Sequence, residues 1–335
     1  MPLHGREQEV IMSNYQLAPQ ADQIIRIKVV GVGGAGGHIV NRMAQMNIPH
    51  IQYAAINTDA KAIFASEAGD RLLIGKDLTG GLGTGGNIAL GKHAAEGAAE
   101  AINHVFQNTD MLFLTAGLGG GAGTGALPVA ARLAKDQGIL TIAVVTLPFS
   151  FEGKERIRRA EDGLAMLKAC VDALIVIPND NLRKVSEEKL TFTNAFDVAD
   201  RVLSQTVQNI IDLIQRPAYI NTDFADVTAI LRNAGTLHVG FASASGINRV
   251  DAVLREISHS ILLNTSVTGA TGILFCITAS EELSLEEGER LSEGVRAAAA
   301  EDVNMIFGMD FDNTLGGSVQ AMLLAVGMDK ERGLL

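Results

Sequence analysis

Two glycine-rich stretches carry the clearest chemical signal in this sequence of 335 residues. The first glycine loop is residues 31–37, Gly-Val-Gly-Gly-Ala-Gly-Gly, and the second glycine loop is residues 117–125, Gly-Leu-Gly-Gly-Gly-Ala-Gly-Thr-Gly. Each follows an apolar run and opens a helical pattern. Glycines let a backbone approach a phosphate closely, and the free N–H groups at the start of the next helix attract its negative charge. Both loops therefore predict contact with nucleotide phosphates.

The first glycine loop by itself leaves other interpretations open. Gly31, Gly33 and Gly36 fit the GxGxxG pattern of dinucleotide-binding folds, and the next predicted strand ends in Asn57-Thr58-Asp59, where an acidic residue would hold a ribose hydroxyl. A nicotinamide-dependent oxidoreductase is thus one alternative, and a tight turn without a ligand is another. The second glycine loop argues against the oxidoreductase, because the roughly four negative charges of a triphosphate need donors from several loops, whereas a dinucleotide needs no second cradle.

A third glycine loop, residues 80–87, reads Gly-Gly-Leu-Gly-Thr-Gly-Gly-Asn. It either supplies further contacts to the same phosphates or serves as a disordered connector. No GxxxxGK(S/T) motif with its phosphate-binding lysine occurs in the chain.

A polar cluster far along the chain offers the other half of a hydrolytic site. Asn221, Asp223 and Asp226 place three polar groups within six residues, and hydrolysis requires a group that orients the attacking water. A structural alternative is a helix cap, because Asp223 or Asp226 at the start of a helix through Leu231 would accept from its unpaired N–H groups. Taken alone, the cap is the simpler interpretation.

The elements that must position these residues alternate regularly. Strands are predicted over residues 24–32, 51–56, 111–115, 139–145 and 172–177, with helices through residue 46 and over 123–137 and 153–169. Strands that are apolar on both faces and separated by helices imply a parallel sheet covered on both sides, a doubly wound α/β fold to about residue 190. One long helix, 194–215, ends at Pro217. Beyond it, strands over 237–242, 272–277, 304–309 and 319–326 alternate with helices near 252–262 and 286–300, which predicts a second, smaller α/β region.

Composition excludes several classes of protein. The formal net charge is −11, and no basic face of the kind that nucleic-acid binding needs is visible. No apolar run approaches the roughly 18 residues of a membrane span, and the start of the chain has no signal-peptide pattern. Cys170 and Cys276 lie in apolar runs without metal-type spacing, so buried free thiols are expected. We expect a protein of the cytoplasm.

The order of these motifs resembles the tubulin/FtsZ family of GTPases, and within it the bacterial cell-division FtsZ proteins. The second glycine loop is similar to the tubulin signature loop. Residues 148–156, Pro-Phe-Ser-Phe-Glu-Gly-Lys-Glu-Arg, resemble the loop for ribose and guanine, and 177–180 with Ala195-Phe196 resemble the base-binding segments. Residues 221–226 match the catalytic loop after the central helix. The resemblance covers about residues 24–330.

The resemblance implies a fold, a domain order and a set of site residues. The expected fold is a Rossmann-type GTPase domain (24–192), a central helix (193–216) and a smaller α/β polymerisation domain (217–330), with a flexible arm (1–23) and a tail remnant (331–335). The implied GTP- or GDP-binding residues are Gly33, Gly34, Ala35, Gly36, Gly37, His38, Gly83, Thr84, Gly85, Gly86, Asn87, Gly119, Gly120, Gly121, Ala122, Gly123, Thr124, Gly125, Glu152, Arg156, Asn179, Phe196 and Asp200.

Individual roles follow from the same resemblance. Glu152 is assigned to the ribose, Arg156 to the nucleotide, and Asn179 with Asp200 to the guanine edge, whose N–H groups a carboxylate accepts. Phe196 would stack on the base; without the resemblance, a core helix residue is the better interpretation of Phe196.

The resemblance also makes hydrolysis intermolecular. The catalytic loop, with Asn221, Asp223 and Asp226, would enter the pocket of the next subunit, so that assembly into a head-to-tail homopolymer completes the enzyme. The triphosphate implies Mg²⁺ without a dedicated protein cage. The expected partners are further copies of the chain and division-ring proteins, with neither nucleic acid nor direct membrane insertion, and the expected location is the division site.

Some positions depart from the family pattern. His38 stands where Asn is usual, Ala122 replaces a Thr of the signature loop, Ile88-Ala89 replace Pro-Glu, and Arg201 stands where Asn or Asp is common. They suggest a divergent member, and a GTP-binding scaffold with weak turnover is the alternative function. The sequence ends at Leu335, before the usual linker and tail; whether the protein naturally lacks them stays open.

Overall fold

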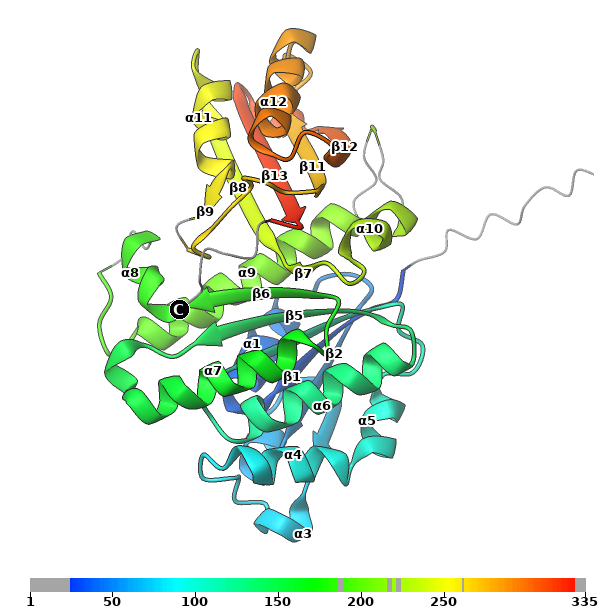
Figure 1. Ribbon diagram of the computed structural model, residues 1–335, viewed down its shortest axis with the longest axis vertical. Coiled ribbons are helices and arrows are strands. Elements are labelled where there is room, and N and C mark those ends of the chain that lie inside the picture. The colour runs from blue at the N-terminus through cyan, green and yellow to red at the C-terminus, as the bar shows by residue number, and fades with distance from the viewer. Residues whose placement is uncertain (1–24, 186–188, 216–218, 221–223, 261, 329–335) are drawn as a thin grey trace, which may run out of the picture.

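The computed structural model describes residues 25–185, 189–215, 219–220, 224–260 and 262–328. Two layered regions are stacked along the long axis of the molecule, and a long helix, α9 (Ala195–Gln215), runs between them (Figure 1). The predicted arm and tail, and the Asn221 and Asp223 positions, lie outside the described residues.

The larger region is built on a seven-stranded sheet whose neighbouring strands all pair in parallel. Its strands run in the order β3 (Asp70–Leu73), β2 (Ile51–Asn57), β1 (Ile27–Val32), β4 (Met111–Gly117), β5 (Leu140–Leu147), β6 (Ala173–Pro178) and β7 (Gly235–Thr236). Every residue of β1 is buried, as a strand covered by helices on both faces requires. The predicted doubly wound α/β fold is confirmed.

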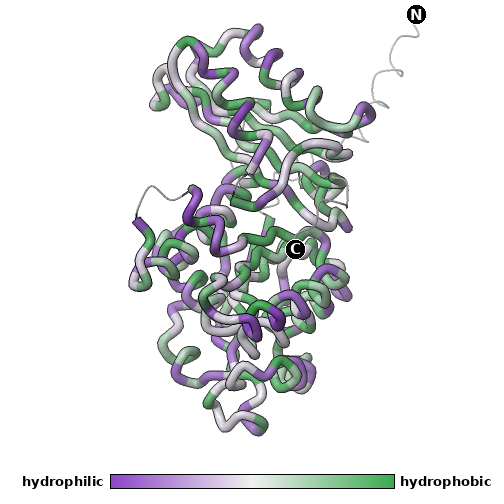
Figure 2. The backbone as a smooth tube through the Cα atoms, turned by 60° about the vertical axis from the view of Figure 1, so that its left-hand side comes forward, coloured by the Kyte–Doolittle hydropathy of each residue, from purple (hydrophilic) through white to green (hydrophobic). Residues whose placement is uncertain are grey.

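Two hydrophobic cores cover the two faces of this sheet. The core on one face is completed by α9 and by α1 (Gly33–Gln45) and α10 (Phe224–Leu231). The other face is covered by α4 (Ile88–Glu96), α5 (Ala99–Val105), α6 (Ala122–Asp136) and α7 (Lys154–Lys168). In Figure 2 the hydrophobic segments concentrate in the strands inside each region.

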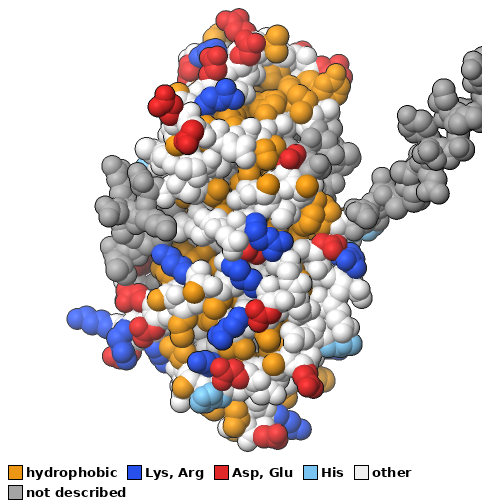
Figure 3. Space-filling model, turned by 45° about the vertical axis from the view of Figure 1, so that its right-hand side comes forward, with side chains coloured by type: hydrophobic (Ala, Val, Ile, Leu, Met, Phe, Trp, Pro, Cys, Tyr) orange, Lys and Arg blue, Asp and Glu red, His pale blue; other side chains and the backbone are white. Residues whose placement is uncertain are grey.

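The smaller region is a four-stranded sheet with helices on it. The strand order is β12 (Asn304–Phe311), β11 (Gly272–Ala279), β13 (Ser318–Val326) and β8 (His238–Ser245), and its two pairings with β13 are antiparallel. Helices α11 (Arg249–Ile257) and α12 (Leu285–Ala298) pack into its core. Acidic side chains gather at the top of the molecule, over the region that contains α12, whereas both signs of charge are interspersed below (Figure 3).

Short elements complete the chain. They are α2 (Ala60–Phe64), α3 (Lys76–Thr79), α8 (Leu182–Val185), β9 (His259–Ser260), β10 (Thr265–Ser266), and the single 3₁₀ turns Ser150–Glu152, Asn179–Asn181 and Asn313–Leu315. None of the helices in the described part of the chain has both the length and the apolar character to cross a membrane.

One predicted helix is wrong at its end. The pattern over 252–262 predicts a helix that continues to residue 262, but α11 ends at Ile257 and is followed by a strand. Ser258 donates its hydroxyl to the Leu254 carbonyl oxygen, and His259 and Ser260 pair with β10. Tertiary pairing therefore overrides an apolar spacing that fits a helix.

Candidate functional site

The first and second glycine loops leave adjacent strands of the large sheet. β1 pairs with β2 on one side and with β4 on the other, so the direction of strand order reverses between β1 and β4. In open α/β sheets the connections diverge at such a reversal, and ligands bind in the crevice that this leaves at the carboxyl ends of the strands. α1 begins directly after β1, and α6 begins soon after β4, so both helix N-termini open on this crevice.

The two loops contact each other through their backbones. A Cβ on Gly33 would lie 2.7 Å from the backbone nitrogen of Gly123, and one on Gly36 would overlap the Thr115 carbonyl oxygen. Glycine is therefore required there by packing. Gly34, Gly37 and Gly120 are different, because a Cβ on any of them would meet no heavy atom of the described residues within 4 Å. Their missing side chains leave open space, which fits the close approach of a phosphate.

Electrostatics also favour an anion at this position. No side chain in the described part of the chain caps α1 or α6, and neither helix has an acidic residue in its first turn. Their first N–H groups and the positive end of each helix dipole are thus available to a ligand. Ala122 opens α6, so the loss of the family's threonine hydroxyl there leaves the backbone donors unchanged.

The third glycine loop docks onto the second. A Cβ on Gly121 would lie 2.8 Å from the Asn87 backbone nitrogen and would overlap the Thr84 hydroxyl. The Gly83 N–H donates to the Thr58 carbonyl oxygen (3.2 Å), and the Asn87 side chain accepts from the Leu90 N–H at the start of α4. The loop is therefore held in contact with the crevice by defined hydrogen bonds, and it is not a disordered connector.

Glu152 and Arg156 form a compact pair beside the second glycine loop. Glu152 accepts from the Phe149 N–H (2.8 Å) and from Arg156 Nε (3.0 Å), and its side chain is only 7% exposed. The Arg156 side chain covers Gly119, where a Cβ would lie 2.7 Å from Arg156 Cγ. In this structure the Glu152 carboxylate stabilises the turn that contains it by accepting the Phe149 N–H. A carboxylate has further lone pairs that can accept from a ribose hydroxyl.

Two groups predicted to recognise the base are mostly withdrawn from solvent. The Asn179 side-chain oxygen is buried and has no hydrogen-bond partner among the described residues. Burial raises the pKa of Asp200 to about 6, although the charges of His38 and Arg42 oppose the shift. His38 Nδ1 lies 3.9 Å from Asp200 Oδ2. A buried carboxylate and an unpaired amide oxygen suit a ligand that brings N–H donors, as a guanine edge does.

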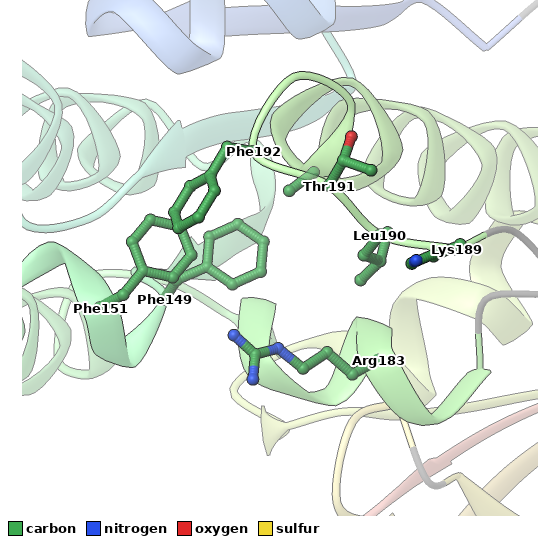
Figure 4. A pocket seen from close by; sticks show the side chains of 8 residues that line it. Phe149, Phe151, Arg183, Lys189, Leu190, Thr191 and Phe192 are labelled. Carbon is green, nitrogen blue, oxygen red and sulfur yellow. The ribbon is translucent and has the colours of Figure 1, made fainter.

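Phe196 is not a core residue, since 46% of it is exposed. Its ring meets Phe149 edge to face with centroids 5.5 Å apart. Beside it, Phe149, Phe151 and Phe192 border a cavity of about 400 Å³, with Arg183 and Lys189 on the opposite side (Figure 4). Neither Asn179 nor Asp200 is among the eight residues that line the cavity, so it lies next to the predicted base-reading groups and not around them.

Asp226, the described member of the polar cluster predicted for catalysis, lies far from the glycine loops of the same chain. Asp226 is in the first turn of α10, and Asn221 and Asp223 precede it outside the described residues. Phe196 and Asp200 lie near the start of α9, whose 21 residues span roughly 30 Å before the chain reaches α10. In Figure 1, α8 and α10 mark the two opposite sides of the molecule. The structure does not bring Asp226 to the glycine loops of its own chain.

The sequence prediction missed the aromatic cavity and the position of Arg159, which contacts the third glycine loop from α7. The spacing of two phenylalanines in residues 148–156 was a signal for the cavity, but the partner Phe192 comes from another segment.

For a metal, the described part of the chain holds no group of three or more His, Cys, Asp or Glu side chains suited to an ion.

Comparisons with known proteins agree with this geometry. Residues 26–187 match the GTPase domain of the Tubulin/FtsZ family, and residues 235–329 match the FtsZ family C-terminal domain. The empty FtsZ dimer of M. jannaschii is similar over 93% of this chain and 94% of its own, with 38% identity and a TM-score of 0.82. A tryptophan-to-tyrosine mutant of the same FtsZ has 40% identity, coverages of 91% and 92%, and a TM-score of 0.82. CetZ2 of Haloferax volcanii, in a GTPγS-bound protofilament, shares the fold at 22% identity, with coverages of 92% and 95% and a TM-score of 0.77.

Proposed function

Because the chain belongs to the tubulin/FtsZ family of GTPases, we propose that it assembles head-to-tail into protofilaments of a cell-division ring and hydrolyses GTP where two subunits meet. The observation that carries the proposal is the separation of two half-sites. The glycine loops converge at one end of α9, and Asp226 lies in α10, past its other end.

Nucleotide binding would use the groups gathered at the sheet edge. The free N–H groups at the starts of α1 and α6 would hold the phosphates, with the third glycine loop beside the terminal phosphate. Asp200 and Asn179 would accept from the guanine N–H groups, and the exposed face of Phe196 would cover the base. Within such a site Mg²⁺ would be carried by phosphate oxygens and water, which is its usual mode beside triphosphates.

Hydrolysis needs a second subunit in this proposal. The glycine loops themselves carry no carboxylate. Of the two groups that would orient water, Asp226 is in the first turn of α10, past the far end of α9, and Asp223 precedes it in the sequence. A contact that joins one end of a subunit to the other end of the next cannot close on itself, so it produces a filament. The dimer and protofilament in which the FtsZ and CetZ relatives were solved support such assembly.

The proposal divides the chain by role. Residues 24–192 would bind GTP, 193–216 would form the central helix, and 217–330 would carry the catalytic loop and the polymer contact. A scaffold that binds GTP and assembles but turns over slowly is the alternative, for which Ala122 and His38 at the nucleotide site are the supporting features.

A mixing experiment tests the shared site. Asp226→Asn should bind GTP like the wild type but lose at least about a hundredfold in turnover, because the group that orients water is gone. Asp200→Asn should lose GTP affinity but keep its own Asp226. When the two variants are mixed, the intact pocket of the first meets the intact Asp226 of the second, so phosphate release should return.

The matched control is Asp251→Asn, since Asp251 occupies the first turn of α11 as Asp226 does that of α10; its turnover should equal the wild-type rate. Wild-type turnover per subunit should also rise with protein concentration above a threshold. A mixture no more active than the sum of its parts would contradict intermolecular catalysis. GTP-dependent filaments without turnover in the wild type would select the scaffold.

A further inference from the structure

Three arginines in the first turns of α7 differ in their partners. Arg156 Nε pairs with Glu152 at 3.0 Å, and the Arg158 guanidinium pairs with Glu155 at 3.1 Å. Arg159 pairs with no carboxylate of the residues that the structure describes. Among the described residues, its guanidinium donates to two backbone oxygens, those of Gly86 at 2.8 Å and Glu155 at 3.2 Å. Arg159 is therefore the one whose positive charge is not neutralised by a described neighbour.

The Gly86 carbonyl belongs to a peptide group that is held from both sides. Arg159 binds its oxygen, and the N–H of the same peptide, on Asn87, donates to the Thr84 carbonyl oxygen at 3.0 Å. A carbonyl oxygen turned toward a phosphate would repel it. By binding this oxygen, Arg159 fixes the Gly86 carbonyl on the side of α7.

The tip of the third glycine loop has little else to order it. Gly85 and Gly86 have φ values of 58° and 84°, so both adopt the left-handed conformation. Among the described residues, neither Gly85 nor Gly86 donates its N–H to a hydrogen bond. A pair of glycines loses more conformational freedom on ordering than any other pair of residues. The base of the loop is held separately, by Gly83 N–H to Thr58 and by the Asn87 cap of α4.

We propose that Arg159 is a positioning residue for the terminal phosphate of GTP. It holds the Gly85–Gly86 tip of the third glycine loop in the conformation that leaves its N–H groups available, and it adds an unneutralised positive charge to a site that has no phosphate-binding lysine. The inference rests on the proposed function, since it assigns this loop to the terminal phosphate. GDP, which lacks that phosphate, makes little use of either contribution.

The test compares nucleotide affinities of purified full-length variants. Arg159→Ala should weaken binding of a non-hydrolysable GTP analogue by roughly tenfold, the scale of one charge-assisted hydrogen bond, while GDP affinity changes less than about twofold. Arg159→Gln keeps an N–H donor without the charge, and Arg159→Lys keeps the charge on an ammonium group in place of the guanidinium. Each variant should therefore recover part of the affinity for the GTP analogue that Arg159→Ala loses. In steady state the KM for GTP should rise more than kcat falls.

Arg158→Ala is the matched control, because Arg158 lies one residue away, is 66% exposed and pairs only with Glu155; both affinities should stay at wild-type values. Thermal unfolding of each variant with bound GDP reports on folding. Equal losses for the GTP analogue and GDP in Arg159→Ala would overturn the inference, and so would wild-type binding of both. If the wild-type protein itself binds neither nucleotide, the proposed function fails instead.

Discussion

Two helices of the larger region, α1 and α6, and one helix of the smaller region, α12, begin in opposite ways. α1 and α6 start without a side-chain cap or an acid in the first turn. α12 starts with a complete capping box, in which Ser284 and Glu287 each accept from the backbone of the other, and Glu287 also binds the Arg249 guanidinium through both oxygens. The smaller region satisfies this helix start internally, whereas the larger region leaves donors for a ligand. An unsatisfied helix start is therefore informative about binding.

The same contrast holds for two carboxylates. The Arg249 guanidinium holds the pKa of Glu287 down to about 2, so this acid stabilises the fold when ionised. Burial raises the pKa of Asp200 to about 6, so that acid destabilises the nucleotide-free fold when ionised. The ionised Asp200 thus lowers the free energy of unfolding, whereas the ionised Glu287 raises it. Three variants probe this difference between the two regions.

Gly121→Ala should have the largest effect. The φ of Gly121 is −84°, which alanine adopts readily, but a Cβ there would press on Thr84 and Asn87. We expect the free energy of unfolding to fall by about 3 kcal/mol and GTP affinity to fall roughly a hundredfold, measured by urea unfolding and nucleotide titration. The matched control is Gly288→Ala in α12, where a Cβ meets nothing within 4 Å of the described residues; it should gain about 0.5–1 kcal/mol and leave GTP affinity unchanged. Equal behaviour of the two variants would remove the distinction between the regions.

Asp200→Asn should stabilise the nucleotide-free protein while it weakens GTP binding. The folded-state pKa of about 6 lies above the usual 3.8, so the folded protein loses stability as pH rises from 3.8 through 6. The variant should therefore exceed the wild type by about 2–3 kcal/mol above pH 6, and the difference should close as pH falls from 6 toward 4. Urea unfolding across this pH range measures it. A variant less stable than the wild type at pH 8 would contradict an unsatisfied carboxylate at this position.

Glu287→Gln should destabilise the smaller region by about 1–2 kcal/mol, because it removes the charge from the pair with Arg249, while the glutamine oxygen can still accept from the Ser284 N–H in the capping box. Its folded-state pKa of about 2 lies below the usual 4.5, so the contribution is complete above pH 4.5 and is lost as pH falls from 4.5 toward 2. The stability gap between the variant and the wild type should close over that window. GTP affinity at pH 7 should not change, and a loss of affinity would show that the two regions are not separable in this way.

Local patterns predicted the elements of the larger region well, and the reasons are physical. Each of the buried strands β1, β4, β5 and β6 is a short apolar run next to a glycine turn or a helix, and such runs have few alternatives. The segment 60–110 was not assigned to elements, because α2, α3 and α5 are short and only weakly patterned. β7, two residues long, is defined by its pairing with β6 and not by its own sequence.

For the candidate site, the loops were predictable and their contacts were not. Glycine clusters before helices indicate phosphate binding from composition alone. The overlap that a Cβ on Gly121 would cause, the cavity bordered by Phe151 and Phe192, and the hydrogen bond from Arg159 to Gly86 all join segments that are far apart in the sequence. No local rule relates such segments.

The sequence by itself determined which groups are on offer: glycine loops suited to phosphates, a cluster of acids far along the chain, and a long helical segment between them. The tertiary structure decided which donors stay free, which carboxylate has its pKa raised by burial, and which of the three arginines at the start of α7 pairs with no carboxylate of the described residues. The reason is that residue type fixes what a group can donate or accept, whereas burial and pairing depend on neighbours that only the folded chain brings into contact.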